Sequence, residues 1–251
     1  MNVFGRTDIG TVRSSNQDAY ISGILPNGAV WTAVCDGMGG ANGGNVASMM
    51  AVDVISSSFE DAAPSISDET DFPTLLQEIL NEANRRIFEK ASETPELSGM
   101  GTTAVLVLIF QQRCYVAHIG DSRAYLFRDG HLRRLTEDHS LVQELVRLGE
   151  ITPEQARTHP RRNVITRVIG VGPVVEADCT VTDFISEDVL LSCTDGLSGY
   201  ADDDVLEKMI REYKGQDLVD HLFDFALKAG GADNITVSLI DNRSNATEVR
   251  P

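Results

Sequence analysis

The chain has 251 residues and is 42% hydrophobic, which suffices for one globular domain with a sizeable core. Its 21 Lys and Arg residues against 38 Asp and Glu residues give a formal charge of −17, which argues against nonspecific binding to nucleic acid or to an anionic membrane. Four cysteines without a Cys-x-x-Cys pair favour buried thiols in a reducing compartment over zinc ligands or disulfides. With no charged-then-apolar N-terminal segment and no apolar run of about 20 residues, we expect a cytoplasmic protein.

The N-terminal part predicts a hairpin whose second strand ends in an acid. Two apolar runs, 21–25 and 29–34, flank the Asn-Gly pair at 27–28, the strongest short signal for a β-hairpin. The second run continues to Asp36 and then to glycine, which predicts a buried strand that stops in a tight turn. A carboxylate on a rigid strand end suits a hard cation, but Asp-Gly is also a common turn pair. This stretch alone therefore leaves both interpretations open.

Acids stand at predicted strand ends in three further places, which are Asp121, Asp195 and Asp233. Four such acids, far apart in the sequence, can converge in the folded chain and suggest a metal site. Carboxylate oxygens favour Mg²⁺ or Mn²⁺ over zinc, and a pair of these ions activates water for in-line attack on a phosphoryl group.

The rest of the chain alternates helical and strand patterns. The predicted helices are 44–59, 75–91 with the capping residue Asp71, 205–213 with the capping residue Asp202, and 217–229. The predicted strands are 3–8, 102–110, 114–119, 124–127, 132–135, 174–181, 189–193 and 235–240. Helix pairs that flank many antiparallel strands predict an α+β fold, with a central β-sandwich of two mainly antiparallel sheets flanked by helices on both sides (a four-layer αββα arrangement).

Residues 136–170 differ in kind from the rest. They carry two short helical patterns and then a local basic run, which comprises Arg157, His159, Arg161, Arg162 and Arg167. Such a segment, inserted among strands of an acidic protein, is typical of a lid or a recognition element. A plain two-helix connection with solvated arginines remains the alternative, and it is the favoured reading for any single arginine.

Two other phosphate chemistries are excluded by inspection. The glycines of 39–44 resemble a phosphate-binding loop, but Asn45-Val46 stand where the Lys-Ser/Thr pair should follow. A cysteine-dependent phosphatase needs an arginine six positions after its nucleophile, and no cysteine of this chain has one there.

Seven short motifs occur in a fixed order along the chain. They are RSSNQD (13–18), DGMGG (36–40), GMGTT (99–103), GDSR (120–123), LTEDHS (135–140), TDGL (194–197) and DNITV (233–237). Together they resemble the ordered motifs of the metal-dependent serine/threonine protein phosphatases of type 2C, and most closely the compact bacterial members. The resemblance extends from about residue 4 to residue 240. It implies a single phosphatase domain over 1–241, with a flap at about 136–170 beside the site, and a polar C-terminal tail at 242–251.

The resemblance also implies the ligands of two Mn²⁺ or Mg²⁺ ions. Asp36 would bridge both ions, and the carbonyl oxygen of Gly37 would complete the shell of one of them. Asp195 and Asp233 would be direct ligands. Asp18 would orient metal-bound water.

Two further residues take roles from the family. Arg13 would grip the substrate phosphate through its planar fork of N–H donors. Asp121, together with Asp195, would hold a third, weaker ion, although Asp-Ser is also a routine turn pair.

The implied reaction is direct attack of metal-bridged water on a phosphoserine or phosphothreonine, without a covalent phosphoenzyme. The implied partners are phosphorylated proteins and a cognate Ser/Thr kinase, with no nucleic acid and no membrane, and we expect a monomer. Histidines that some family members carry near the site are replaced here by Met38 and Ala41, so no histidine is assigned as proton donor and metal-bound water would serve. The alternative function is a catalytically weak or silent phosphoprotein-binding scaffold, but silent members would be expected to lose the metal acids or Arg13.

Three motif residues or segments have a plainer interpretation. Residues 99–103 are expected to form a turn that leads into a strand. His118, inside an apolar strand, is expected to be a satisfied core histidine. His139 is expected to stand at the start of a helix rather than to contact the flap.

Overall fold

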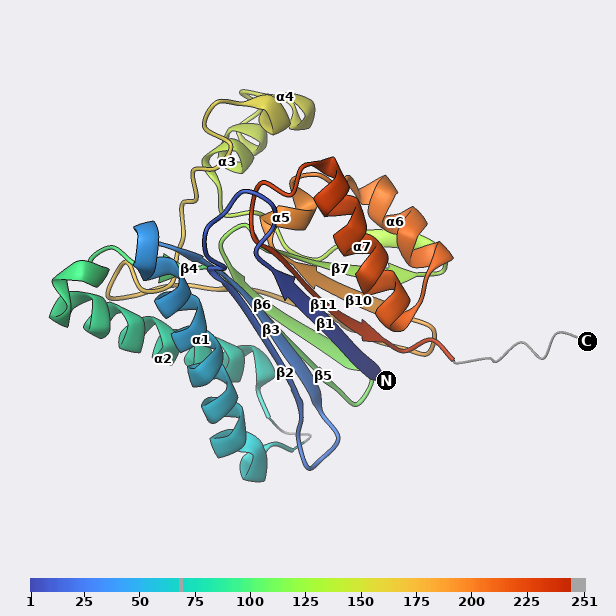
Figure 1. Cartoon of the computed structure of the whole chain (residues 1–251). Helices are drawn as coiled ribbons and strands as arrows, with labels where there is room; N and C mark the ends of the chain where they lie inside the picture. The colour runs from blue at the N-terminus through green and yellow to red at the C-terminus, as the bar shows by residue number, and fades with distance from the viewer. Residues whose placement is uncertain (68–69, 245–251) are drawn as a thin grey trace, which may run out of the picture.

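Two antiparallel β-sheets pack face to face, and helices cover both outer faces (Figure 1). The computed structural model describes residues 1–67 and 70–244, with the backbone alone at 41–42. One sheet has the strand order β2-β3-β5-β6-β9, with the short β4 paired to β3, and the other has the order β1-β11-β10-β7-β8. The predicted α+β sandwich is therefore confirmed.

The strands follow the predicted runs closely. Their bounds are β1 (Asn2–Asp8), β2 (Asp18–Ile24), β3 (Val30–Met38), β4 (Gly101–Thr102), β5 (Ala104–Phe110), β6 (Arg113–Ile119), β7 (Arg123–Arg128), β8 (His131–Arg134), β9 (Asp178–Asp183), β10 (Val189–Cys193) and β11 (Ile235–Asp241). The first and last strands, β1 and β11, are neighbours in one sheet.

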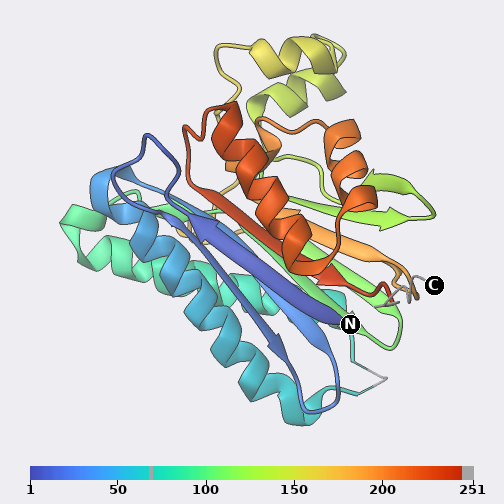
Figure 2. The ribbon, with the colours of Figure 1, turned by 45° about the vertical axis from the view of Figure 1, so that its right-hand side comes forward.

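The helices form two pairs, a flap and one short turn. Their bounds are α1 (Gly40–Ala62), α2 (Phe72–Glu93), α3 (Leu141–Arg147), α4 (Pro153–Thr158), α5 (Asp195–Ser198), α6 (Asp203–Glu212) and α7 (Gly215–Ala229), with 3₁₀ turns at Ala63–Ser65 and Pro95–Leu97. Helices α1 and α2 cover the sheet that contains β3, and α6 and α7 cover the sheet that contains β10 (Figure 1, Figure 2). Apolar side chains fill three layers, one under each helix pair and one between the sheets.

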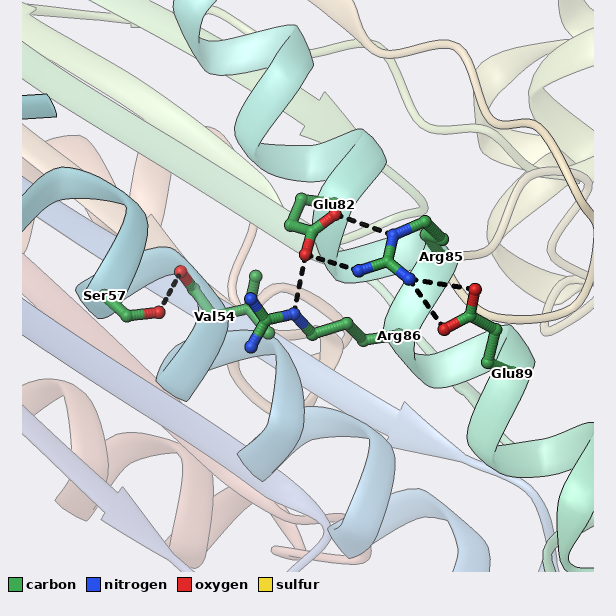
Figure 3. Close-up of polar contacts among 6 residues, drawn as sticks. All are labelled: Val54, Ser57, Glu82, Arg85, Arg86 and Glu89. Atoms are coloured by element: carbon green, nitrogen blue, oxygen red, sulfur yellow. Dashed lines mark hydrogen bonds and ion pairs between the residues drawn. The ribbon is translucent and has the colours of Figure 1, made fainter. Parts of the chain in front are cut away.

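Helix α2 shows how the sequence separates its two faces. Asp71 caps the first turn by accepting a backbone N–H, and seven side chains at helical spacing are buried. On the outer face, Glu82 accepts hydrogen bonds from Arg85 and Arg86, which lower the pKa of Glu82 to about 2, and Arg85 also bonds Glu89 (Figure 3). These exposed ion pairs add little stability, because water and salt screen them.

Most element boundaries agree with the prediction to within a few residues, and two of the differences have a clear cause. Helix α1 begins at Gly40, earlier than the predicted residue 44, because Gly39 adopts a φ of 134° that turns the chain directly from β3 into the helix. The strand predicted at 174–181 forms only from Asp178 onward, and Val174 is 83% exposed in the preceding loop. An apolar run therefore does not suffice to make a strand where no neighbour pairs with it.

The prediction of four buried thiols is wrong at one position. Cys35, Cys114 and Cys193 are buried free thiols, whereas Cys179 is exposed. Cys179 lies on β9, which is an edge strand with one face open to solvent.

The flap forms two short capped helices at one end of the sandwich, beside α5 (Figure 1, Figure 2). Ser140 caps α3 and Thr152 caps α4, the latter in a capping box with Gln155. The two ends of the flap meet in a short ladder, where Leu141 N–H donates to the Val164 carbonyl at 2.8 Å. The predicted helical segment between strands is therefore confirmed.

The C-terminal end of the described chain is anchored. The side chain of Arg243 is only 7% exposed, pairs with Asp241 at 2.6 Å and donates to the carbonyl of Ile210. Residues 245–251 of the predicted tail, and residues 68–69, lie outside the described residues. Over 1–67 and 70–244, every helix is too short or too polar to cross a bilayer.

One hydroxyl pair links the two sheets through the apolar layer. Thr32 of β3 and Ser238 of β11 are fully buried, and their hydroxyl oxygens are 2.6 Å apart. The Thr32 hydroxyl donates to the Ile21 carbonyl, so it accepts the hydrogen of Ser238.

We expect Thr32→Val to destabilise the protein by about 1–3 kcal/mol, because it strands the Ser238 hydroxyl without a partner. Ser238→Ala should cost under about 1 kcal/mol, since Thr32 keeps its bond to Ile21. The double variant should cost less than the sum of the two. Chemical denaturation of all four proteins measures this. Strictly additive losses would contradict the coupling of the two hydroxyls, and a larger loss in Ser238→Ala than in Thr32→Val would contradict the assigned donor direction.

Candidate metal centre

Two of the predicted acids lie opposite each other in the sheet. Asp18 begins β2 and is paired in register with Asp36 of β3, so antiparallel pairing holds both side chains at one end of the sandwich. Asp18 is buried, and its carboxylate accepts a hydrogen bond from the hydroxyl of Thr194 at 2.8 Å. Strand β3 continues to Met38, so Asp36 lies two residues before the strand end rather than at it.

The backbone of Asp36 is held by the GMGTT motif at 99–103, for which the sequence predicted only a turn. Its N–H donates to the hydroxyl of Thr103 at 3.0 Å, and its carbonyl accepts from the hydroxyl of Thr102 at 2.9 Å. The expected turn lies at 98–99 and leads into the short strand β4 (Gly101–Thr102), and the two threonines also position Asp36. Sequence reasoning missed this role, because a Thr-Thr pair before a strand is too common to signal it.

Three more acids come to the same place from other elements. Asp195 is the first residue of α5, directly after β10, and Asp233 precedes β11. Asp121 follows β6 in a turn, and its Oδ1 atom is buried without a hydrogen-bond partner among residues 1–67 and 70–244. The negative charges of all three raise the pKa of Asp36, which places them around it.

The acids repel one another in a partly buried pocket. Burial and then the charge of Asp18 raise the pKa of Asp36 well above its usual value. Burial raises the pKa of Asp18 to about 7, and burial with the charge of Asp195 raises that of Asp121 to about 7. Burial and then the charge of Asp233 raise the pKa of Asp195 to about 6. In each case burial is the larger cause and repulsion between the acids adds to it, so the ionised carboxylates are incompletely compensated in the pocket.

One arginine reaches the cluster from the rim. Arg13 lies after β1, is exposed, and donates from Nη2 to Asp233 Oδ2 at 2.6 Å. A guanidinium has five N–H donors, so this contact leaves others for an anion. Arg13 thus lies where an incoming phosphate would meet both its own donors and any cations held by the acids.

Gly37 allows β3 to pass very close to α1. A Cβ atom at Gly37 would lie 2.1 Å from the carbonyl oxygen of Gly44 and 2.5 Å from that of Gln17, so no larger residue fits. Its N–H donates to the Gln17 carbonyl at 3.0 Å. The glycine is therefore required for packing as well as being the predicted neighbour of the bridging acid.

The five acids fit divalent cations. The donors are all carboxylate oxygens, which Mg²⁺ and Mn²⁺ prefer, and the unpartnered Oδ1 of Asp121 is an acceptor that no protein group satisfies. Positive charge in the pocket would relieve the repulsion that raises the pKa values. All five predicted acids and Arg13 are brought together, and none of the six lies elsewhere.

A second group of ligand-type side chains lies outside this pocket. Ring nitrogens of His118 and His139 and a carboxylate oxygen of Asp178 all lie within 4.8 Å of one another. His118 is buried and its Nε2 is 2.8 Å from the carbonyl of Glu137, which confirms the expected core histidine. His139 is also buried and directly precedes Ser140, the cap of α3, as expected, but its ring also contacts Arg167 of the flap, so the expectation that it does not contact the flap is wrong.

A cleft of ≈ 580 Å³ joins the acid cluster to the flap. Asp121 and Asp195 line one end of it, and Arg157 and Arg162 of the flap line the other. Arg157 pairs with Asp202, so this predicted helix cap binds the flap instead of its own helix N-terminus.

Comparison with known proteins decides the family. The sequence profile described as protein phosphatase 2C matches residues 10–239. The chain belongs to the protein phosphatase 2C family. Among curated phosphatase 2C relatives, the serine/threonine phosphatase stp of Listeria monocytogenes serotype 4b (strain F2365) is 39% identical over 239 residues, which cover 94% of each chain.

Solved phosphatase structures match the fold as well. The serine/threonine phosphatase Stp1 from Staphylococcus aureus superposes with a TM-score of 0.89 at 34% identity, over 95% of this chain and 94% of that one. The catalytic domain of the serine/threonine protein phosphatase PstP, solved in complex with 2 manganese ions, superposes with a TM-score of 0.84 at 33% identity, over 96% of this chain and 97% of that one. Phosphatase 2C members thus use divalent metal ions, in agreement with the donor set found here.

We expect Mn²⁺ to raise the Tm of this phosphatase 2C member more at about pH 7 than at about pH 5. Asp18, Asp121 and Asp195 have folded-state pKa values above the unfolded value of about 4, so the stability they provide at low pH is lost as the pH rises through about 6 to 7. The ionised carboxylates then bind cations, which stabilise the folded state.

Differential scanning calorimetry with and without Mn²⁺ at both pH values measures this effect. The exposed variant Asp204→Asn is the matched control and should keep the full Mn²⁺ response, whereas Asp36→Asn should lose most of it. An equal Mn²⁺ shift at both pH values would contradict the interpretation of the cluster.

Proposed function

We propose that this protein is a metal-dependent serine/threonine phosphoprotein phosphatase. The observation that carries the proposal is the convergence of five carboxylates and Arg13 in a member of the phosphatase 2C family. The scaffold alternative requires loss of the metal acids or of the arginine, and this chain retains them all.

The metal ligands are assigned within this proposal. Asp36, Asp195, Asp233 and the carbonyl oxygen of Gly37 would hold two Mn²⁺ or Mg²⁺ ions. When bound, the ions supply positive charge and activate water for direct in-line attack on phosphorus. Asp121, with Asp195, holds a third and weaker ion, which the unpartnered Oδ1 of Asp121 supports.

The remaining roles belong to the chain itself. The side chains of Thr194 and Thr236 hydrogen-bond the carboxylate of Asp18 and hold it in place, and Asp18 would orient water. Arg13 binds the substrate phosphate while Asp233 holds its guanidinium in place. The ring contacts of His118 and His139 run to Glu137 and to the base of the flap, so water remains the proposed proton donor to the leaving group.

The wider setting is proposed on the same basis. The substrates are phosphorylated proteins, and a Ser/Thr kinase must supply them, since the reaction consumes phosphoesters. Every proposed ligand comes from one chain, so a monomer suffices for activity. The buried thiols are those expected of a cytoplasmic protein.

Release of phosphate from a phosphothreonine peptide, with and without Mn²⁺, tests the proposed function. We expect Mn²⁺-dependent turnover that falls by roughly 100-fold or more in Asp36→Asn and Asp195→Asn, because each variant removes a ligand. Circular dichroism should show both variants folded, and the surface control Asp204→Asn should keep wild-type rates. Folded wild-type protein without metal-dependent turnover would leave only the scaffold function.

The flap arginines predict a substrate preference. Arg162 lines the cleft, and Arg157 is already paired with Asp202, so Arg162 is the charge most available to a substrate. We expect kcat/KM to be about two- to fivefold higher for a phosphopeptide with acidic flanks than for one with basic flanks, a size typical of one screened charge pair. Arg162→Gln should reduce the preference, whereas Arg86→Gln on α2 should not. Equal kcat/KM on both peptides would remove this preference.

A further inference from the structure

His139 lies at the base of the flap and grips the turn that carries Asp121. Its backbone N–H donates to the carbonyl of Gly120 at 2.9 Å, and its ring Nδ1 accepts from the Gly120 N–H at 3.1 Å. Both polar groups of Gly120 are thereby bound to one residue. Gly120 has a φ of 104°, and a Cβ there would lie 2.5 Å from Thr103 Cγ2, so this turn needs glycine and has little intrinsic rigidity.

The opposite side of His139 is bound to the end of the flap. Its carbonyl accepts from the Thr166 N–H at 2.8 Å. Its ring Nε2 is 3.3 Å from Asp178 Oδ2 and 3.3 Å from Arg167 Nη1, and Arg167 donates to Asp178 Oδ1 at 2.6 Å. One residue thus joins the exit of the flap, the start of β9 and the Gly120 turn.

The hydrogen bonds assign the tautomer of this ring. Because Nδ1 accepts from a backbone N–H, the proton of the neutral ring must sit on Nε2, where it faces Asp178. Burial and then the neighbouring His118 lower the pKa of His139, which agrees with a neutral ring. A metal-binding histidine instead directs a lone pair at the ion and donates through its other nitrogen. The group of His118, His139 and Asp178 is therefore a hydrogen-bonded linkage rather than a metal site, and stacking of the two rings at 4.6 Å fixes its orientation.

Asp121 is sensitive to this linkage because it directly follows Gly120. Its buried Oδ1 has no protein partner in the described chain, so no side-chain hydrogen bond at that atom fixes the carboxylate. The backbone of the turn must then set its position.

We propose that His139 is a positioning residue that ties the C-terminal end of the flap to Asp121, so that attachment of the flap and cation binding at Asp121 are coupled. The coupling to cations rests on the proposed role of Asp121 as a metal ligand. The positioning of Gly120 by His139 rests only on the two hydrogen bonds between these residues.

Two substitutions remove the two ring contacts of His139 one at a time, the Nδ1 contact with Gly120 and the Nε2 contact with Asp178. In His139→Asn, the amide oxygen falls near the position of Nδ1, so the bond from Gly120 is kept and the contact with Asp178 is lost. In His139→Gln, the longer side chain reaches the position of Nε2, and the bond from Gly120 is lost. His159→Gln is the matched control, since the Nδ1 of His159 also accepts a backbone N–H, from Arg161 at 3.1 Å, but on the exposed flap.

The first measurement is hydrogen exchange of the Gly120 amide by NMR in the metal-free protein. We expect exchange to be about five- to tenfold faster in His139→Gln, the loss of one hydrogen bond, and near wild type in His139→Asn and His159→Gln. Unchanged exchange of the Gly120 amide in His139→Gln would contradict the assigned hydrogen bond from Gly120 to His139.

The second measurement is Mn²⁺ binding, followed by electron paramagnetic resonance of the free ion. We expect the weakest class of site to lose roughly 10-fold in affinity in His139→Gln, and to weaken in the same direction in Arg167→Gln, which contacts His139 and Asp178. Wild-type Mn²⁺ binding in Arg167→Gln would overturn the coupling to the flap. Asp121→Asn distinguishes the two ideas. Unchanged Mn²⁺ binding in this variant would contradict the role of Asp121 as a metal ligand, whereas the hydrogen bond between His139 and Gly120 is tested by the exchange measurement alone.

Discussion

Repulsion among five carboxylates is the constraint on which the functional end of this protein depends. Asp36 lies at the centre, with Asp18 beside it in the ladder and Asp121, Asp195 and Asp233 around it. Arg13 offers a positive charge from the rim, and the charge of Arg123 also lowers the pKa values of Asp121 and Asp195. Such a cluster cannot contribute to stability on its own. The sandwich, with its three apolar layers, must supply the free energy that holds the acids together until cations neutralise them.

The elements that deliver the acids are rigid, and those that surround them are adjustable. Asp18 and Asp36 are fixed by strand pairing, and two threonines clamp the backbone of Asp36. The flap, in contrast, touches the body through side-chain contacts such as Arg157 to Asp202, and through backbone hydrogen bonds between Ile169 and Thr102 at its end. Because the strands that carry the acids are fixed while the contacts of the flap can vary, the same reaction can be combined with different protein substrates.

The sequence predicted the fold class, most strands and the main acids, because these depend on local periodicity and on an acid placed where a strand ends. It did not predict that the threonines of 102–103 hold Asp36, or that His139 contacts Gly120, since both depend on which segments meet across the sheets. The strand expected from 174 failed for the same reason, as an apolar run needs a partner to become a strand. The exposed Cys179 shows that residue type predicts burial poorly on an edge strand.

The adjacency of the first and last strands has a consequence for how the protein is made. Because β1 pairs with β11, Arg13 meets Asp233 across nearly the whole length of the chain. On the ribosome, the N-terminal acids emerge long before β11, so the pocket stays incomplete until β11 has been synthesised. A nascent chain is thereby kept from hydrolysing anything before its own fold has closed.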